Sequence, residues 1–344
     1  MKLSQPLLYF AVFIFALAIS YFITPLISML ASFFKILDKP ASSKLHKHPT
    51  PRLGGVAIFL GYFLSLYLTR NVDSFVGIII FGGIGILLLG ILDDIFRVPA
   101  VIKLIYIFTL TAILAKQGLT VSLFGKLFYL NFLITLLWIV GVTSALNAVD
   151  NMDGLAGGLG VIAAITFFII AIRTSQWGWA TLAVALCGAL LGFLRYNFPP
   201  AKIFMGDSGS LFLGFTLAAI GIKGEWSSHP IKASIIPVLV LGVPIFDLSY
   251  IVIRRWREGT AKGIIKAITF CAKDHLSHHL VELGFNQWVS VLFIYFIAIC
   301  VSIGAIVLQN AAGWDAILLF LQFILIFILV MLLLGITTKK RLKL

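Results

Sequence analysis

Two aspartates, Asp150 and Asp153, stand three residues apart in the segment NAVDNMDGLAGG, directly after a run of mostly apolar residues. Neighbouring carboxylates repel each other, and an acid in apolar surroundings is costly unless it faces protein or water. A bound cation relieves both costs. Further acids with similar apolar neighbours recur along the chain, namely Asp93, Asp94, Asp207 and Asp247.

The chemistry of these side chains favours a hard metal ion. Carboxylate oxygens suit Mg²⁺ or Mn²⁺, and Mg²⁺ often needs only one or two carboxylates plus substrate phosphates. The three cysteines are scattered and indicate neither a zinc site nor a disulfide. Glycines around the acids should let the backbone approach a ligand closely, namely Gly154, Gly157, Gly158, Gly206 and Gly209.

The composition identifies the elements that must position these acids. The chain has 344 residues, of which 61% are hydrophobic and 11% charged, and its mean hydropathy is +1.10. Apolar stretches of about 20 residues are long enough to cross a bilayer as helices. We therefore predict an all-α polytopic membrane protein with eleven spans, at about 6–33, 54–69, 75–92, 101–117, 130–148, 158–173, 178–195, 210–224, 232–252, 288–308 and 316–336.

The basic residues predict the orientation of these spans. Most of the 26 Lys and Arg residues fall in one set of connections and the C-terminal tail, which the positive-inside rule places in the cytoplasm. The N-terminus is then outside. Ten of the thirteen acids and five of the six histidines lie on this same face. The chain reads as a single membrane domain with cytoplasmic loops at 35–53, 93–103, 149–157, 196–209 and 253–287.

Other interpretations exist for each feature. The net charge of +13 fits topology and attraction to anionic headgroups better than nucleic-acid binding. Asp207 could simply cap a helix, and the Asp93–Asp94 pair could lie in a solvated turn. GDSGS resembles a serine-protease string, but no histidine and aspartate can be placed beside Ser208. None of these alternatives explains why four acidic sites share one face.

Two cytoplasmic loops carry candidate phosphate or sugar ligands. The first loop contains Lys44, His46 and Arg52, and such a cationic loop beside a membrane is suited to clamp phosphate. The last loop contains His275 and His278, with His279 following. At this spacing on a helix the three imidazoles would project from one side. Hydrogen bonding to phosphate or sugar and a merely exposed helix are the open alternatives.

These motifs, in this order, resemble the polyprenyl-phosphate N-acetylhexosamine-1-phosphate transferase family. The likeness covers nearly the whole chain. It rests on Lys44 to Gly55, Asp93–Asp94, Asn147 to Gly158, Asn197 with Lys202 to Ser210, Asp247 with Arg254 and Arg255, and the last-loop histidines. Two positions depart from the family pattern: Ser277 replaces the middle imidazole of HxHH, and Ser144 replaces a common Asn. The absence of three consecutive histidines favours the N-acetylglucosamine branch over the muramoyl-pentapeptide branch.

The resemblance implies a reaction and roles. Undecaprenyl phosphate would attack a UDP-N-acetylhexosamine, releasing UMP and starting a cell-envelope glycan such as O-antigen or teichoic acid. It places the enzyme in the bacterial inner membrane, with its active site on the cytoplasmic face and a homodimer as one alternative. The resemblance assigns catalysis to Asp93, Asp94, Asp150, Asp153, His275 and His278. It assigns Mg²⁺ (or Mn²⁺) binding to Asp207, Asp94 and Asp153. It assigns substrate binding to Lys44, His46, Arg52, Asn147, Asn197, Lys202, Asp247, Arg254 and His279.

Two rival classes make different predictions. A transporter would place its acids near the middle of the membrane, often on broken helices. A CDP-alcohol phosphatidyltransferase would carry one compact acidic array, which this sequence lacks. Acids at the cytoplasmic ends of spans favour an interfacial enzyme that takes one substrate from lipid and one from water.

Overall fold

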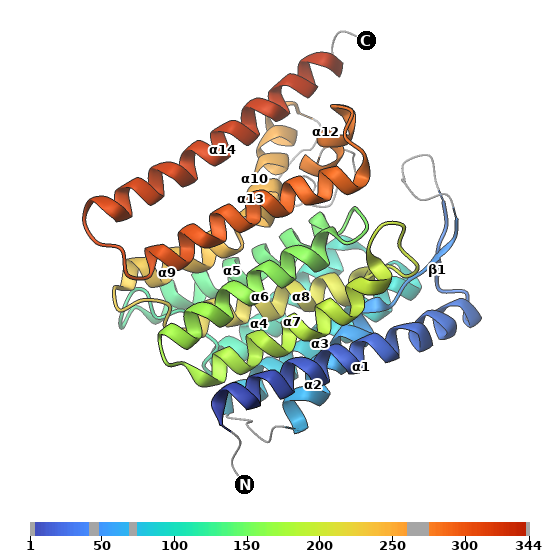
Figure 1. The fold of residues 1–344 in the computed structure, drawn as a ribbon, viewed down its shortest axis with the longest axis horizontal. Coiled ribbons are helices and arrows are strands. Elements are labelled where there is room, and N and C mark those ends of the chain that lie inside the picture. The colour runs from blue at the N-terminus through green and yellow to red at the C-terminus, as the bar shows by residue number, and fades with distance from the viewer. Residues whose placement is uncertain (1–3, 41–47, 69–73, 260–274, 342–344) are drawn as a thin grey trace.

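The computed structural model describes residues 4–40, 48–68, 74–259 and 275–341, and it is a bundle of long helices with one small strand pair. Figure 1 shows α1 and α2 at one edge of the bundle and α14 at the opposite edge. The helices in chain order are α1 (Gln5–Phe33), α2 (Gly54–Leu68), α3 (Ser74–Phe96), α4 (Ala100–Lys116), α5 (Phe128–Val149), α6 (Leu155–Arg173), α7 (Trp177–Asn197), α8 (Gly206–Lys223), α9 (Pro230–Val240), α10 (Gly242–Arg257), α12 (Leu276–Glu282), α13 (Gln287–Leu308) and α14 (Trp314–Arg341).

Helices coincide with all eleven predicted spans, and the all-α class is confirmed. Seven helices are long and apolar enough to cross a membrane, or eight if the bent pair α9 and α10 is one span. A helix satisfies its own backbone hydrogen bonds, so apolar helices of this length suit a lipid environment. Eleven crossings and the orientation of the termini stay predictions.

The ninth predicted span is broken in the structure. Helices α9 and α10 meet at Leu241 with a bend of 75°. Pro237 lies inside α9 and Pro244 in the first turn of α10, and proline lacks the N–H that a continuous helix needs. The bend therefore follows from the local sequence, although apolar length alone predicted one helix.

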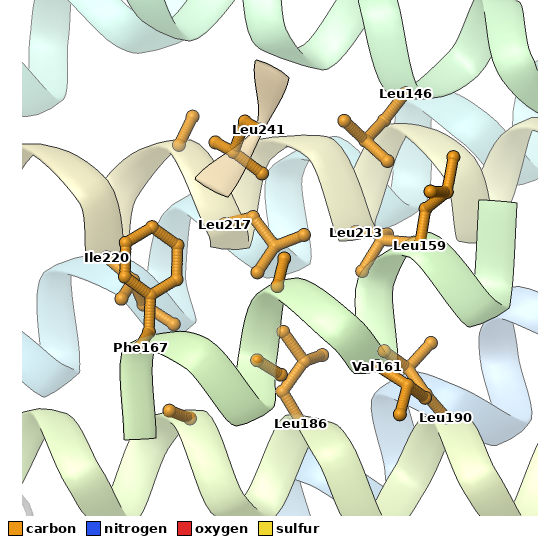
Figure 2. Packing of buried hydrophobic residues seen from close by; sticks show 14 of the residues in the cluster. Leu146, Leu159, Val161, Phe167, Leu186, Leu190, Leu213, Leu217, Ile220 and Leu241 are labelled. Carbon is orange, nitrogen blue, oxygen red and sulfur yellow. The ribbon is translucent and has the colours of Figure 1, made fainter. Parts of the chain in front are cut away.

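The core of the bundle is formed by α7 and α8, whose side chains are buried over most of their length. Helix α8 packs against α3 and α5, and α7 packs against α1 and α6. Figure 2 shows part of this core from close by. Phe167 of α6 lies beside Ile220 of α8, and Leu186 and Leu190 of α7 point toward the same apolar layer. This rigid centre holds the ends of α3, α5 and α8 in a fixed relation.

A two-residue strand pair follows α1. β1 (Leu37–Asp38) pairs antiparallel with β2 (Thr50–Pro51), and the register places Asp38 opposite Thr50. The backbone N–H of Arg52 bonds to the carbonyl of Ile36, and the N–H of Phe204 bonds to that of Pro51. These bonds fix the end of the first loop against the segment before α8.

Candidate active site

The acidic residues predicted from the sequence converge at one end of the bundle, where α3 and α5 end and α8 begins. Asp93 and Asp94 are in the last turn of α3, and both are buried. Asp207 is in the first turn of α8, and Asn147 is in the last turn of α5. Three separate helices thus bring polar side chains to one place.

Asp94 is bound to the start of α8. Its Oδ1 accepts a hydrogen bond from the backbone N–H of Asp207 at 3.0 Å, and its Oδ2 accepts one from the N–H of Ser208 at 3.1 Å. The first N–H groups of a helix have no partner within the helix, and an anion at this end is also favoured by the helix dipole. Asp94 therefore caps α8 from a different helix.

Gly206 makes this contact feasible. Its φ is +71°, a conformation that residues with a side chain rarely adopt. A Cβ atom at this position would lie 2.5 Å from Oδ2 of Asp94. The glycine immediately before Asp207 is thus required by both its backbone conformation and its neighbour.

Lys103 supplies a positive charge inside the acidic cluster. Its Nζ lies 2.5 Å from Oδ2 of Asp93 and 2.9 Å from Oδ2 of Asp207. Asn147 holds the other oxygen of Asp207, because its Nδ2 donates to Oδ1 at 2.8 Å. The same amide nitrogen lies 2.8 Å from the hydroxyl of Ser210. Asp207 is therefore oriented by two helices in addition to its own.

Arg52 adds a second cation. Its guanidinium pairs with Asp38 of β1, and its other terminal nitrogen lies 3.7 Å from Oδ1 of Asp94. Asp150 follows the last residue of α5, where burial and then the nearby Asp94 carboxylate raise its pKa to about 7 against an opposing effect of Arg52. The site thus combines carboxylates and cations at close range, as expected for binding phosphates and a metal ion.

Asp153 and Asn197 stabilise a neighbouring loop. Oδ2 of Asp153 accepts a hydrogen bond from the N–H of Ala201 at 3.0 Å. Oδ1 of Asn197 accepts one from the N–H of Gly154 at 3.0 Å, and its Nδ2 donates to the carbonyl of Ile203 at 2.9 Å. Asn197 therefore joins the segment before α6 to the segment before α8.

A cavity of about 550 Å³ opens beside Asp153. Phe204 and Trp288 contribute aromatic surface, and His48 and Asn286 contribute polar atoms. The indole of Trp288 lies against Phe198, with ring centroids 5.0 Å apart, and donates to the carbonyl of Pro199 at 3.1 Å. The cavity thus has the size and the mixed lining of a small-molecule site.

The last-loop histidines form a second cluster around α10. Nδ1 of His275 lies 2.7 Å from Oδ2 of Asp247, whose Oδ1 accepts from the N–H of Leu276 at 2.8 Å. His279 is buried, and its Nε2 lies 3.1 Å from a guanidinium nitrogen of Arg254. His275 is the N-cap of α12, and His275 and His279 both contact side chains of α10.

Ser277 connects the two clusters. Its hydroxyl donates to Oδ1 of Asn151 at 2.7 Å, which joins α12 to the segment after α5. His278 is half-buried, with its ring centroid 6.3 Å from that of His275. The departure of this chain from HxHH therefore has a structural role.

The remaining predicted ligands lie elsewhere. Lys202 is exposed on the segment before α8, and Lys44 and His46 lie outside the described residues. Within the described chain, no three His, Cys, Asp or Glu side chains form a group that could hold a metal ion, so Asp94, Asp153 and Asp207 do not form a preassembled metal triad. The two oxygens of Asp94 are directed at helix amides instead.

Most of the glycines that were predicted to let a ligand approach instead let neighbouring helices pack closely. A Cβ on Gly158 would lie 1.9 Å from the hydroxyl oxygen of Tyr295, and one on Gly209 would lie 2.8 Å from the Cα of Gly55. A Cβ on Gly157 would approach Leu194 at 2.9 Å. That expectation is wrong for these three positions, because space beside a small residue in a packed bundle is filled by the next helix.

Lys103 was missed by the sequence analysis. A lysine in the first turn of a predicted span is usually read as a topological signal, and its partner Asp207 is 104 residues away in sequence. The one feature of the sequence that could have indicated its role is its closeness to Asp93. Lys103 follows Asp93 by ten positions and can reach it across a short loop.

The protein is thus a bundle of apolar helices of membrane-spanning type with a cation-linked acidic site at one end. The profile of glycosyl transferase family 4 matches residues 76–225, which include Asp93, Asp94, Asn147 and Asp207. The chain is 36% identical, over 91% of its length and 88% of the relative, to a probable undecaprenyl-phosphate N-acetylglucosaminyl 1-phosphate transferase of Bacillus subtilis. The chain belongs to this family.

Two further relatives are similar over most of the chain. One is a decaprenyl-phosphate N-acetylglucosaminephosphotransferase of Mycobacterium tuberculosis, 33% identical over 84% of this chain and 80% of the relative. The other is an undecaprenyl-phosphate alpha-N-acetylglucosaminyl 1-phosphate transferase of Thermotoga maritima, 30% identical over 80% of this chain and 83% of the relative.

Proposed function

We propose that this protein transfers N-acetylglucosamine-1-phosphate from UDP-N-acetylglucosamine to undecaprenyl phosphate and releases UMP. The observation that carries the proposal is the alignment of 91% of the chain with a relative of that printed name, with the acidic site inside the aligned region. A transporter is disfavoured, because Asp93, Asp94 and Asp207 lie at helix ends rather than in the middle of the bundle.

The reaction needs no energy source beyond its substrate. An oxygen of the lipid phosphate attacks the β-phosphorus of the UDP-sugar, a new phosphoanhydride forms, and the bond to the α-phosphate breaks with UMP as leaving group. A phosphate monoester has its second pKa near 6, so the nucleophile is already mostly ionised near neutral pH. Catalysis then depends chiefly on positioning and on neutralising charge.

The cations of the site are placed for that task. Lys103 and Arg52 contact carboxylates, and their N–H groups can also donate to phosphate oxygens. Asp93, which is paired with Lys103, would orient this ammonium toward the lipid phosphate. Asp247 would orient His275 toward the sugar or the diphosphate, since a histidine that is hydrogen-bonded through one nitrogen presents the other.

Mg²⁺ fits the donor set of this site. The side chain of Asp207 is 29% exposed, and its neighbours Asp93, Asn147 and Ser210 also offer oxygen atoms. Two carboxylates with substrate phosphates are sufficient for Mg²⁺. When bound, the ion would neutralise charge on the diphosphate. We propose Asp207 as its main protein ligand and Asp93, which shares Lys103 with it, as the second.

The cavity beside Asp153 suits the nucleoside of the donor. Uracil offers a flat face for Phe204 or Trp288 and an N–H group for the carboxylate of Asp153. A Phe204→Leu variant should raise the KM for UDP-N-acetylglucosamine about tenfold and change kcat less, because it removes ground-state contact. A fall in kcat of the same size at unchanged KM would show that the nucleoside binds elsewhere.

The function is tested with purified protein. Incubation with Mg²⁺, undecaprenyl phosphate and a panel of UDP-sugars should release UMP most rapidly with UDP-N-acetylglucosamine. EDTA should stop the reaction, and Mg²⁺ or Mn²⁺ should restore it. Full activity in EDTA would contradict the metal proposal but not the transferase. Absence of UMP with every sugar would contradict the transferase itself.

The membrane face is part of the proposal. We place the acidic site on the cytoplasmic side of the bacterial inner membrane, because most basic residues cluster on that face. Single cysteines introduced at Lys39 and Ala312 of a cysteine-free variant should be labelled from opposite sides of the membrane. Labelling of Lys39→Cys from outside in intact cells would invert this orientation.

A further inference from the structure

A second cavity lies at the end of the bundle away from the acidic site. It has a volume of about 310 Å³ and is bounded by α9, α13 and α14. Its walls are mostly apolar and include Ile235, Leu239, Val301, Leu319 and Phe323. Helix α13 begins near Pro199, beside the candidate active site, and the cavity lies toward its other end.

The cavity exists because α14 packs incompletely on the bundle. Phe327 and Phe323 of α14 are in contact, and Phe327 also contacts Phe246 of α10 with ring centroids 4.4 Å apart. Ala316 and Leu319, nearer the start of α14, line the cavity instead. Among the described side chains of α14, only Val330 is buried. Most described side chains in the first half of this helix are therefore left uncovered by the rest of the chain.

Gly304 leaves the wall of α13 open. It lines the cavity, and a Cβ atom added to it would meet nothing within 4 Å. An empty apolar cavity of this size is costly, because the atoms that line it lose their packing contacts. A flexible hydrocarbon chain from the surrounding bilayer would restore them.

Two basic side chains lie at the cavity. Lys232 and His229 line it, together with the polar Gln322 and the thiol of Cys300. The ammonium of Lys232 donates to the carbonyl of Ala311, which uses one of its three protons. His229 is exposed one turn earlier. The nearest acid along α14 is Asp315, which does not line the cavity.

We propose that this cavity binds one anionic phospholipid of the leaflet opposite the acidic site. Its acyl chain fills the space between α9, α13 and α14, and its phosphate accepts hydrogen bonds from Lys232 and His229. The ammonium of Lys232 and the N–H donor of His229 are what favour a phospholipid over the polyprenyl tail of a substrate. A polyprenyl chain has one phosphate, which is needed at the other end of the bundle, and so gives no reason for charge here.

The test measures lipid retained by the purified full-length protein. Native mass spectrometry would compare dioleoyl-phosphatidylglycerol, dioleoyl-phosphatidylcholine and undecaprenyl phosphate. We expect one phosphatidylglycerol to remain bound, with about tenfold weaker retention in Lys232→Gln, because one charge-assisted hydrogen bond is lost. Gly304→Leu fills the cavity and should also abolish retention. Lys116→Gln is the control, since Lys116 is an exposed lysine at the same end of the bundle.

Each other outcome overturns the proposal. If phosphatidylcholine is retained as well as phosphatidylglycerol, and Lys232→Gln does not change this, the cavity is only an apolar groove. Retention of undecaprenyl phosphate, lost in Gly304→Leu, would assign the cavity to the substrate tail. Unchanged retention of phosphatidylglycerol in both Lys232→Gln and Gly304→Leu would show that the lipid binds elsewhere. Thermal unfolding and UMP release in detergent should match the wild type for Gly304→Leu, which shows that the variant is folded.

Discussion

Asp94 accepts a hydrogen bond from the backbone N–H of Asp207, so the carboxylate of one helix caps the helix that carries the other. From sequence, Asp207 was the residue expected to act as a cap if it had no catalytic role. Its carboxylate instead faces Lys103 and Asn147. The structural and the chemical roles of these two acids are therefore separable by mutation.

Removal of the Asp94 carboxylate should destabilise the fold. Asp94→Ala leaves the N–H groups of Asp207 and Ser208 without partners, and loss of a cap costs about 1–2 kcal/mol. Asp94→Asn keeps one acceptor oxygen and should cost less. Thermal unfolding in detergent measures both, with the exposed Glu225→Ala as control. An Asp94→Ala protein that unfolds at the wild-type temperature would show that the cap is not stabilising.

Asp207→Asn should behave in the opposite way. The substitution leaves the backbone bonds to Asp94 in place, so its unfolding temperature should fall less than that of Asp94→Ala. Loss of the anionic oxygen near the reacting phosphates should lower UMP release by about 10²–10³-fold. Both properties are measured on the same preparation. A stable variant with normal activity would contradict the proposed role of Asp207 in binding Mg²⁺.

Lys103→Met should create a protein whose stability depends on Mg²⁺. Without the ammonium, Asp93 and Asp207 face each other without a cation, which should cost about 1–3 kcal/mol after allowing for partial exposure. Added Mg²⁺ should restore stability more in this variant than in the wild type. Unfolding temperatures with Mg²⁺ and with EDTA measure the difference, and Lys116→Met is the control. An equal effect of Mg²⁺ on both proteins would show that the ion binds elsewhere.

Asp150 should make stability depend on pH. Burial raises its pKa from 3.8 to about 7 in the folded protein, so the folded state keeps a proton that the unfolded chain has already lost. Stability should therefore fall as the pH rises between these values and then level off. In EDTA, the unfolding temperature of the wild type should fall more from roughly pH 5 to pH 8 than that of Asp150→Asn. Parallel curves for the two proteins would contradict this assignment.

Apolar length and ordered motifs were sufficient to predict the helices and the face that carries the acids. Asp93, Asn147 and Asp207 meet as expected, because α3 and α5 end, and α8 begins, at the same end of the bundle. The kink at Leu241 was harder to predict, since proline inside an apolar helix does not always break it: Pro25 lies within the continuous helix α1. The helix-facing glycines were misassigned for a related reason, since sequence shows a missing side chain but not what fills its place.

Contacts over long sequence distances could not be derived from the sequence. Lys103 reaches Asp207 because α4 and α8 both pack against α3. Arg52 reaches Asp94 because backbone bonds hold the end of the first loop against the segment before α8. The partnership of Asp247 with His275 depends on how α12 lies against α10. A single sequence gives the residue types but not these pairings, and the pairings decide which carboxylate caps a helix and which faces a ligand.

The cap of α8 also sets an order of assembly during synthesis. Asp94 leaves the ribosome 113 residues before Asp207, a delay of roughly 6–23 seconds at ordinary elongation rates. During that time Asp93 already has Lys103, ten residues further along, as a partner. The charge of Asp93 is therefore partly neutralised before α8 is synthesised. The acidic cluster is complete once α8 packs against α3, before the histidines of α12 are synthesised.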